Sequence, residues 1–277
     1  MSHVETASAQ LPAIHTSDDK IVTMANGVIM LDGASAFVPV PVPPAVYAAE
    51  LGAQLKDHLV HAPGADLVEV LEEAIHDVAA RLDLCPGKSP SSTVTILREH
   101  DGWLDLLLLG DNLVVLPEAE ITDRRLSLLD LEPSRRYRRR LARGFGFDAA
   151  HRAILRELQT QQAACRNRPG GYWIAEAEPA AARNALVHRF RTIDVPWVGL
   201  ATDGAYRPMQ HLHLDDWPQL ASVDPEVLEQ ILRRCENWEA RDDPAGVNLP
   251  RAKRHDDKTI AIAMPTPQLE IAGAITQ

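Results

Sequence analysis

Short apolar runs separated by turn residues predict β-strands along much of the chain. Residues 20–24 and 28–31 flank Ala25-Asn26-Gly27, and an Asn-Gly turn between two such runs is typical of a β-hairpin. Three more runs between residues 92 and 116 follow one another with only short turns between them, which predicts a β-meander. The three strands of the meander cover residues 92–99, 103–109 and 113–116. Three further strands are predicted at residues 190–193, 196–202 and 259–264.

Apolar residues at helical spacing predict α-helices between these strands. Tyr47, Leu51, Leu55 and Leu59 define the apolar face of a first helix, and a second helix runs from Leu67 to a stop at Cys85-Pro86-Gly87. Asp148 is placed to cap a helix that reaches about Cys165, and Asp224-Pro225 opens another, since proline is accepted in a first turn. The polar, arginine-rich stretch 118–147 has no clear assignment.

The order of these elements favours one α+β domain. No internal repeat is visible, and no linker separates two cores. We therefore predict a single domain over residues 18–265, with residues 1–17 as a tail or an edge strand and residues 266–277 as a C-terminal tail.

Composition narrows the functional classes. Of 277 residues, 45% are hydrophobic and 24% are charged, as in ordinary globular proteins, and the net charge of −11 argues against non-specific nucleic-acid binding. Aromatic residues make up only 5%, too few for a base-stacking platform, so no specific nucleic-acid partner is expected. Three dispersed cysteines, no signal-peptide pattern and no long apolar stretch predict a cytoplasmic protein without a membrane partner.

Four aspartate dipeptides lie at the edges of predicted strands. They are Asp18-Asp19, Asp32-Gly33, Asp203-Gly204 and Asp256-Asp257. Carboxylates gathered at strand ends offer the all-oxygen ligand set that Mg²⁺ or Mn²⁺ prefers, and such ions activate water for phosphoester hydrolysis. Each dipeptide taken singly also fits an ordinary turn.

Taken in order, these motifs resemble the metal-dependent serine/threonine protein phosphatases of the PPM, or type 2C, family, and compact bacterial members in particular. The shared order is an acidic pair, D-G after a strand, two helices, S-T and G-D in a meander, T-D-G, and a closing D-[DN]-x-T, from Asp18 to Met264. The stretch 166–173 also resembles a signature of the compact bacterial members. The resemblance implies an αββα sandwich, in which two antiparallel β-sheets are flanked by helices.

The resemblance also implies a metal centre with two, possibly three, Mn²⁺ or Mg²⁺ ions. The implied ligands are Asp32 bridging two ions, the Gly33 carbonyl, Asp203, Asp256, Asp18 or Asp19 through water, and Asp111 with Asp203 around a third, weaker ion. The implied activity is hydrolysis of phosphoserine and phosphothreonine on proteins by a metal-activated water, without a covalent intermediate.

One departure from the family pattern concerns the substrate phosphate. The family usually carries a phosphate-binding arginine four residues before the first acidic residue, where this chain has Ile14. His15 is adjacent, and Arg168, Arg251, Lys253 or Arg254 are alternative cations on loops. Asn112 replaces the usual serine after Gly-Asp. Two further hypotheses therefore stay open: a non-catalytic phosphatase-like binding protein, and a phosphatase of small-molecule phosphoesters.

Two more features allow two interpretations each. Six arginines crowd residues 135–143, either as a solvated basic helix or as a segment that docks acidic or phosphorylated partners. His255 adjoins Asp256 and is either a packing residue or a proton donor to the leaving alkoxide. Asp257 is predicted to be a solvated neighbour of Asp256.

Overall fold

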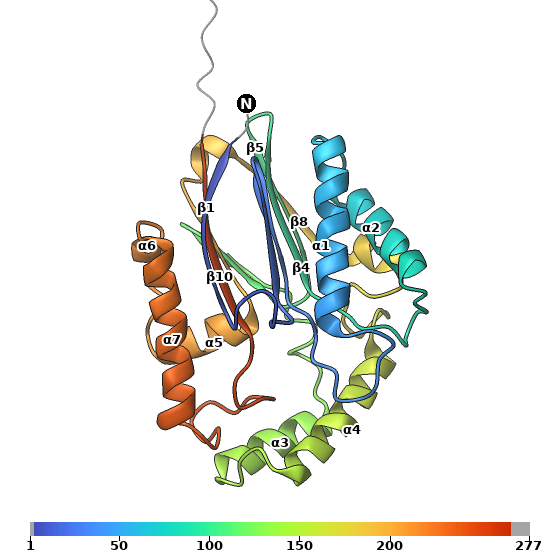
Figure 1. Ribbon diagram of the computed structural model, residues 1–277, viewed down its shortest axis with the longest axis vertical. Helices are drawn as coiled ribbons and strands as arrows, with labels where there is room; N and C mark the ends of the chain where they lie inside the picture. The colour runs from blue at the N-terminus through green and yellow to red at the C-terminus, as the bar shows by residue number, and fades with distance from the viewer. Residues whose placement is uncertain (1–2, 267–277) are drawn as a thin grey trace, which may run out of the picture.

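Two five-stranded antiparallel sheets pack face to face between layers of helices in the computed structural model, which describes residues 3–266 (Figure 1). This arrangement confirms the predicted α+β class and the αββα sandwich. In order across the first sheet lie β1 (Val4–Leu11), β10 (Lys258–Pro265), β9 (Val198–Ala201), β6 (Leu113–Leu116) and β7 (Ala119–Ile121). The second sheet contains β2 (Lys20–Met24), β3 (Gly27–Leu31), β4 (Val94–His100), β5 (Trp103–Leu109) and β8 (Leu186–Arg191).

The hairpin predicted around Asn26 is confirmed by β2 and β3, which pair Met24 with Gly27 and Lys20 with Leu31. Alternate side chains of β3 enter different cores, because successive residues of a strand point to opposite faces. Val28 and Met30 belong to the core between the sheets, whereas Ile29 and Leu31 pack under the helices. Every residue of β3 is therefore buried.

Helices cover the outer face of each sheet (Figure 1). On the second sheet lie α1 (Pro44–His61) and α2 (Leu67–Arg81), whose predicted apolar faces are buried. On the first sheet lie α5 (Asp203–His211), α6 (Trp217–Leu220) and α7 (Pro225–Arg241), with Leu228, Leu232 and Cys235 in the core. No helix within residues 3–266 combines the length and the apolar character needed to cross a membrane.

A further helix pair, α3 (Glu132–Ala142) and α4 (Ala149–Cys165), lies across one end of the sandwich (Figure 1). Asp148 caps α4 as predicted, since its side chain accepts a hydrogen bond from the His151 amide. The pair is fastened to the sandwich at two loops. Gln159 Oε1 accepts hydrogen bonds from the amides of Phe37 and Val38, and His151 Nε2 lies 2.8 Å from the Ala252 carbonyl oxygen.

The structure corrects several local predictions. The meander ends after β5, because β8 occupies the free edge of β5 and β6 pairs with β9 in the other sheet. Residues 192–194 form a short 3₁₀ turn instead of strand, and residues 203–211 form a helix that the sequence did not predict. Of the predicted N-terminal segment, residues 4–11 form the edge strand β1, whereas residues 267–277 of the predicted C-terminal tail lie outside the described residues.

Candidate metal centre

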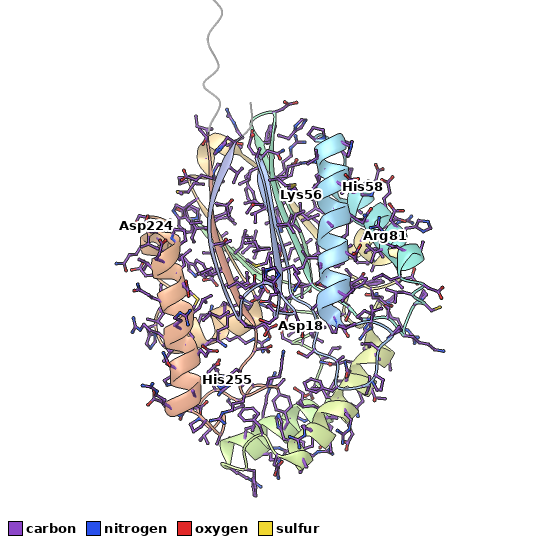
Figure 2. The ribbon with its side chains drawn as sticks, viewed as in Figure 1. Asp18, Lys56, His58, Arg81, Asp224 and His255 are labelled. Atoms are coloured by element: carbon purple, nitrogen blue, oxygen red, sulfur yellow. The ribbon has the colours of Figure 1, made fainter. Side chains whose placement is uncertain are left out.

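Strand pairing brings the predicted aspartates to the same end of the two sheets. Asp19 precedes β2 and Asp32 follows β3, and the partner strands pair at Lys20 and Leu31. In the other sheet Asp203 follows β9, while Asp256 stands two residues before β10. Asp111 lies in the connection from β5 to β6. Figure 2 shows Asp18 at this end of the sandwich, which faces α3 and α4.

Four of these side chains line one cavity of about 180 Å³: Asp32, Asp111, Asp203 and Asp256. Thr93, Arg166 and Phe37 are also in its wall, as is Gln159 of α4. Residues that are up to 224 positions apart in sequence (256 − 32) therefore share one space. These four aspartates of the predicted set therefore lie on one surface of the molecule.

Asp32 is held by its backbone and not by its carboxylate. Its amide donates to Thr93 Oγ1 at 3.0 Å, and its carbonyl accepts from the Thr93 amide at 2.9 Å and from Ser92 Oγ at 3.0 Å. No hydrogen bond reaches its carboxylate from any residue that the structure describes. Burial is the largest cause that raises the pKa of Asp32 well above its ordinary value, and repulsion from the neighbouring carboxylates adds to it. The fold thus places a destabilised carboxylate in the cavity wall.

Asp19 lies behind this cavity and links the two sheets. It is 1% exposed, and its Oδ2 accepts hydrogen bonds from Thr202 Oγ1 at 2.9 Å and Thr259 Oγ1 at 2.8 Å. Burial raises the pKa of Asp19 to about 7, although both hydroxyl donors act in the opposite direction. Asp19 therefore holds its proton below about pH 7, and a nearby positive charge would favour its ionised form by offsetting the cost of burial.

Two glycines allow the strand-end loops to approach one another. A Cβ on Gly33 would lie 2.7 Å from the Asp18 carbonyl oxygen, and a Cβ on Gly204 would lie 2.0 Å from the Asp257 carbonyl oxygen. No side chain fits at such distances, since packed backbone cannot give way. The glycine in each Asp-Gly pair thus serves this close contact, which keeps Asp203 beside the loop of Asp256.

Asn112 fits its buried position and connects the next loop to Asp32. It is 1% exposed, its Oδ1 accepts from Thr93 Oγ1 at 2.9 Å, and its Nδ2 donates to Thr95 Oγ1 at 3.1 Å. Because the same Thr93 hydroxyl accepts from the Asp32 amide, one chain of hydrogen bonds joins Asn112 to Asp32. The amide that replaces the usual serine is therefore a structural part of the centre.

Two cations of the chain itself already pair with the carboxylates. Arg207 Nη2 lies 3.3 Å from Asp203 Oδ2 and 3.4 Å from Asp111 Oδ2, and Lys253 Nζ lies 2.6 Å from Asp256 Oδ1. Burial and the charge of Asp203 raise the pKa of Asp111 to about 6, while Arg207 opposes this shift. Within residues 3–266, no group of three or more His, Cys, Asp or Glu side chains is arranged so that it could bind a metal ion without rearrangement.

The chemistry of the donor set nevertheless fits a hard divalent cation. The acidic side chains that line the cavity are all aspartates, and neither a thiol nor an imidazole lines it. Oxygen ligands of this kind suit Mg²⁺ and Mn²⁺ and disfavour softer metals. Bound divalent ions would also offset the two effects that raise the pKa of Asp32, its burial and the repulsion from the neighbouring carboxylates.

Several predicted residues lie apart from the cavity. His15 and Arg168 are exposed and do not line it. Arg251 is engaged elsewhere, because its Nη1 lies 2.8 Å from Asp243 Oδ2 in a buried pair. His255 Nδ1 lies 3.1 Å from Glu239 Oε2, beside α7 (Figure 2).

One sequence expectation near the centre is wrong. Asp257 is not a solvated neighbour, because its Oδ2 accepts hydrogen bonds from the Ser17 hydroxyl and the Asp18 amide and so fastens the loop before β2. Sequence reasoning also missed Arg166 as a residue of the cavity wall and Arg207 as a partner of the aspartates. The i,i+4 spacing of Asp203 and Arg207 was a usable signal, but only once residues 203–211 are known to be helical.

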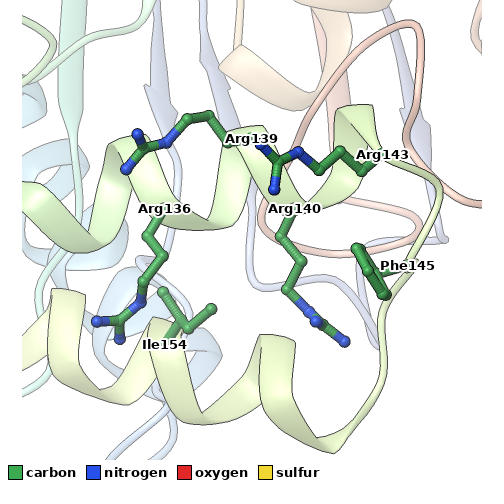
Figure 3. A pocket seen from close by; sticks show the side chains of 6 residues that line it. All are labelled: Arg136, Arg139, Arg140, Arg143, Phe145 and Ile154. Carbon is green, nitrogen blue, oxygen red and sulfur yellow. The ribbon is translucent and has the colours of Figure 1, made fainter.

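The arginine-rich segment forms α3, and its side chains line a separate hollow of about 330 Å³ with Phe145 and Ile154 (Figure 3). Arg136 and Arg140 point toward α4, where they pair with Glu157 and Asp148. Arg139 and Arg143 have no acidic partner among the described residues. Part of the cluster is thus neutralised within the structure, and part remains available to a partner.

Comparison with known proteins supports the fold. No protein-family model matches the chain, and no curated protein matches it in sequence. Among solved structures, the catalytic domain of the serine/threonine protein phosphatase PstP, in complex with two manganese ions, is similar at 13% identity, with a TM-score of 0.51 over 96% of this chain and 100% of that one. PppA, a regulatory component of the type VI secretion system of Pseudomonas aeruginosa, has 13% identity and a TM-score of 0.53 over 96% and 99%.

A bacterial serine phosphatase gives a similar result, with 12% identity and a TM-score of 0.54 over 96% of this chain and 100% of that one. At such low identity these likenesses concern the fold and not the activity. The resemblance drawn from the sequence is confirmed at this level.

Proposed function

Because the chain has the fold of the PPM-type serine/threonine phosphatases, we propose that it is a metal-dependent phosphatase that hydrolyses phosphoserine and phosphothreonine on proteins. The observation that carries this proposal is the convergence of Asp32, Asp111, Asp203 and Asp256 on one cavity. Burying several carboxylates together is unfavourable unless cations neutralise them, and such clusters are typical of functional sites.

We assign the ions to Asp32, the Gly33 carbonyl, Asp203 and Asp256, with Asp19 behind them and Asp111 at the margin. When bound, Mn²⁺ or Mg²⁺ would lower the pKa of water and offset negative charge on the phosphoryl oxygens. The protein's own contribution is positional. Thr93 and Asn112 fix the backbone of Asp32, while Thr202 and Thr259 fix the carboxylate of Asp19.

Lys253 is our candidate for the contact with the substrate phosphate. Ile14, at the position of the usual arginine, is exposed and carries no charge. Of the loop cations that the sequence offered, Arg251 is engaged with Asp243, and Arg168 and Arg254 are exposed. Lys253 is the one that contacts an aspartate of the cavity, at 2.6 Å. Its ammonium group is therefore well placed to meet a phosphate, as a point charge and without the bidentate geometry of arginine.

The neighbouring cavity suggests a protein substrate. A second space of about 400 Å³ is lined by Asp111, Asp203 and Arg207 at one side and by Arg135 and Arg138 of α3 at the other. A chain that places its phosphate at the metal centre would pass these arginines. Positive side chains on a molecule of net charge −11 favour acidic or phosphorylated partners locally. The free thiols of Cys85, Cys165 and Cys235 fit a reducing, cytoplasmic setting.

The proposal is tested with the full chain and a phosphothreonine peptide. Turnover should disappear in EDTA and return with Mn²⁺. Asp32→Asn and Asp203→Asn should lower kcat by about 100-fold or more, because each would lose a charged metal ligand. Asp224→Asn is a matched control, since Asp224 is exposed and its side chain makes no capping hydrogen bond at the start of α7. Undiminished turnover in Asp32→Asn would contradict the assigned site.

A non-catalytic binding protein is the second candidate. It is favoured by the ion pairs of Arg207 and Lys253, which neutralise carboxylates that a phosphatase needs for its ions. Binding of Mn²⁺ without hydrolysis of phosphopeptides or of a panel of phosphorylated metabolites would select this alternative. Preferential hydrolysis of the metabolites would instead identify a small-molecule phosphatase.

A further inference from the structure

Arg207 occupies the space between two aspartates from different loops. Asp203 begins α5, and Arg207 follows one turn later, so that its side chain can return toward the start of the helix. A single nitrogen, Nη2, lies 3.3 Å from Asp203 Oδ2 and 3.4 Å from Asp111 Oδ2. The guanidinium group therefore bridges the loop before β6 and the helix after β9.

This bridged space is where the two carboxylates would share a cation. We call it the third position, to distinguish it from the region around Asp32 and Asp256. Two carboxylates that face one space require positive charge between them, and either a metal ion or a guanidinium group can provide it. Both cannot be present, because metal–oxygen distances near 2 Å would require the ion to displace the guanidinium group and because the two charges repel.

We propose that Arg207 is a built-in cation that replaces a metal ion at the third position, so that this protein takes up two divalent ions and not three. The inference rests on the proposed metal centre and adds the number of ions to it. Arginine keeps its charge throughout the range of pH in which proteins are folded, and it cannot dissociate from the chain. The third position is thus filled at any concentration of free metal.

The arrangement has a consequence for the neighbouring cavity. Arg207 also lines the space of about 400 Å³ that runs from Asp111 and Asp203 toward α3. A fixed guanidinium group at this boundary faces the route assigned to the substrate chain. Arg207 is therefore a positioning residue: it holds Asp111 and Asp203 together, and through Asp203 it affects the assigned metal centre.

The experiment counts bound ions and does not depend on hydrolysis. The full chain is freed of metal and equilibrated with increasing Mn²⁺ in a dialysis cell, and bound Mn²⁺ is measured by atomic emission. We expect two ions for the unaltered chain and a third, weaker ion for Arg207→Ala. The double variant Asp111→Asn with Arg207→Ala should return to two, because the third position then lacks one of its carboxylates.

Two further variants exclude trivial explanations. Arg233→Ala removes a similar i,i+4 pair, between Arg233 and Glu229 on α7, far from the centre, and it should bind two ions. Arg207→Gln keeps most of the side-chain length without the charge, and it should gain the third ion even if Arg207→Ala folds poorly. In turnover, the Mn²⁺ dependence of Arg207→Gln should show a second phase that the unaltered chain lacks.

The possible results separate the two proposals. Three ions in the unaltered chain, or only two in both Arg207 variants, would overturn the role of Arg207 and leave the phosphatase proposal standing. Fewer than two ions in the unaltered chain would overturn the metal centre itself, together with this inference. Two ions that become three only when Arg207 is replaced would support it.

Discussion

The Thr259 hydroxyl donates a 2.8 Å hydrogen bond to the Asp19 carboxylate across 240 positions of sequence. Thr202 donates to the same oxygen, and its own hydroxyl accepts from the Thr259 amide at 3.0 Å. These contacts join the start of β2 in one sheet to β9 and β10 in the other. The end of the sandwich that carries the aspartates is therefore held together by hydrogen bonds to one buried carboxylate.

The pH dependence of stability should reveal this carboxylate. Burial raises the pKa of Asp19 to about 7 from an ordinary 3.8, so the folded state holds a proton that the unfolded chain releases at lower pH. Stability of the metal-free protein should accordingly fall as the pH rises from about 4 to about 7, by an amount on the order of a few kcal/mol. Asp19→Asn cannot ionise and should lose the part of this dependence that comes from Asp19, while Asp32 and Asp111, whose pKa values are also raised by burial, keep their own parts.

Urea unfolding in EDTA at pH 5 and pH 8 measures this difference. The free energy of unfolding of Asp19→Asn, relative to the unaltered chain, should be higher at pH 8 than at pH 5. Added Mn²⁺ should stabilise the unaltered chain more at pH 8, where its carboxylates are free to bind. An equal difference at both pH values would show that Asp19 ionises normally in the folded protein.

Replacement of Lys253 should affect substrate binding. Lys253→Met removes the cation beside Asp256 and keeps much of the apolar stem. We expect KM for a phosphopeptide to rise by about 10-fold or more, the value of one charge-assisted contact, with a smaller change in kcat. Lys56→Met is a suitable control, because Lys56 is an exposed residue of α1 whose Nζ donates a 3.3 Å hydrogen bond to the Thr23 carbonyl. A fall in kcat at constant KM would instead indicate a role in the chemical step.

Asn112 should matter for both stability and metal affinity. Asn112→Ala leaves the Thr95 hydroxyl without its donor and the Thr93 hydroxyl without its acceptor, both in a buried setting. A cost of about 1–3 kcal/mol in the free energy of unfolding is expected. Affinity for Mn²⁺ should also fall, because Thr93 accepts from the Asp32 amide. Asn184→Ala, which loses only a 3.4 Å contact to the Ala180 carbonyl, should change neither quantity.

A methyl group at Gly204 should disrupt the centre from its backbone side. In Gly204→Ala the new Cβ would meet the Asp257 carbonyl oxygen at 2.0 Å, so the loop before β10 must move. Thermal unfolding should occur at a clearly lower temperature, because the free energy of unfolding should fall by about 1–3 kcal/mol or more. Gly52→Ala provides the comparison, since its Cβ would meet only side-chain methyl groups at 3.1 Å. If both variants unfold at similar temperatures, the close contact at Gly204 is not required.

Local elements could be predicted because their causes are local. The hairpin around Asn26 follows from two apolar runs on either side of an Asn-Gly turn. The start of α4 follows from the capping side chain of Asp148. The path of β6 could not be predicted in this way. It depends on the edge of β5 being occupied by β8, which comes some 70 positions later in the sequence (186 − 116).

By itself, the sequence determined where the strands end and therefore which carboxylates stand at their ends. Alternation and turn chemistry act over a few residues, so they can be read along the chain. Only the tertiary structure decided which charges meet. Arg207 and Asp111 are 96 positions apart, and Lys253 reached the centre while Arg168 and His15 did not. Electrostatic pairing depends on distance in space, and that distance is set by packing of the whole sandwich.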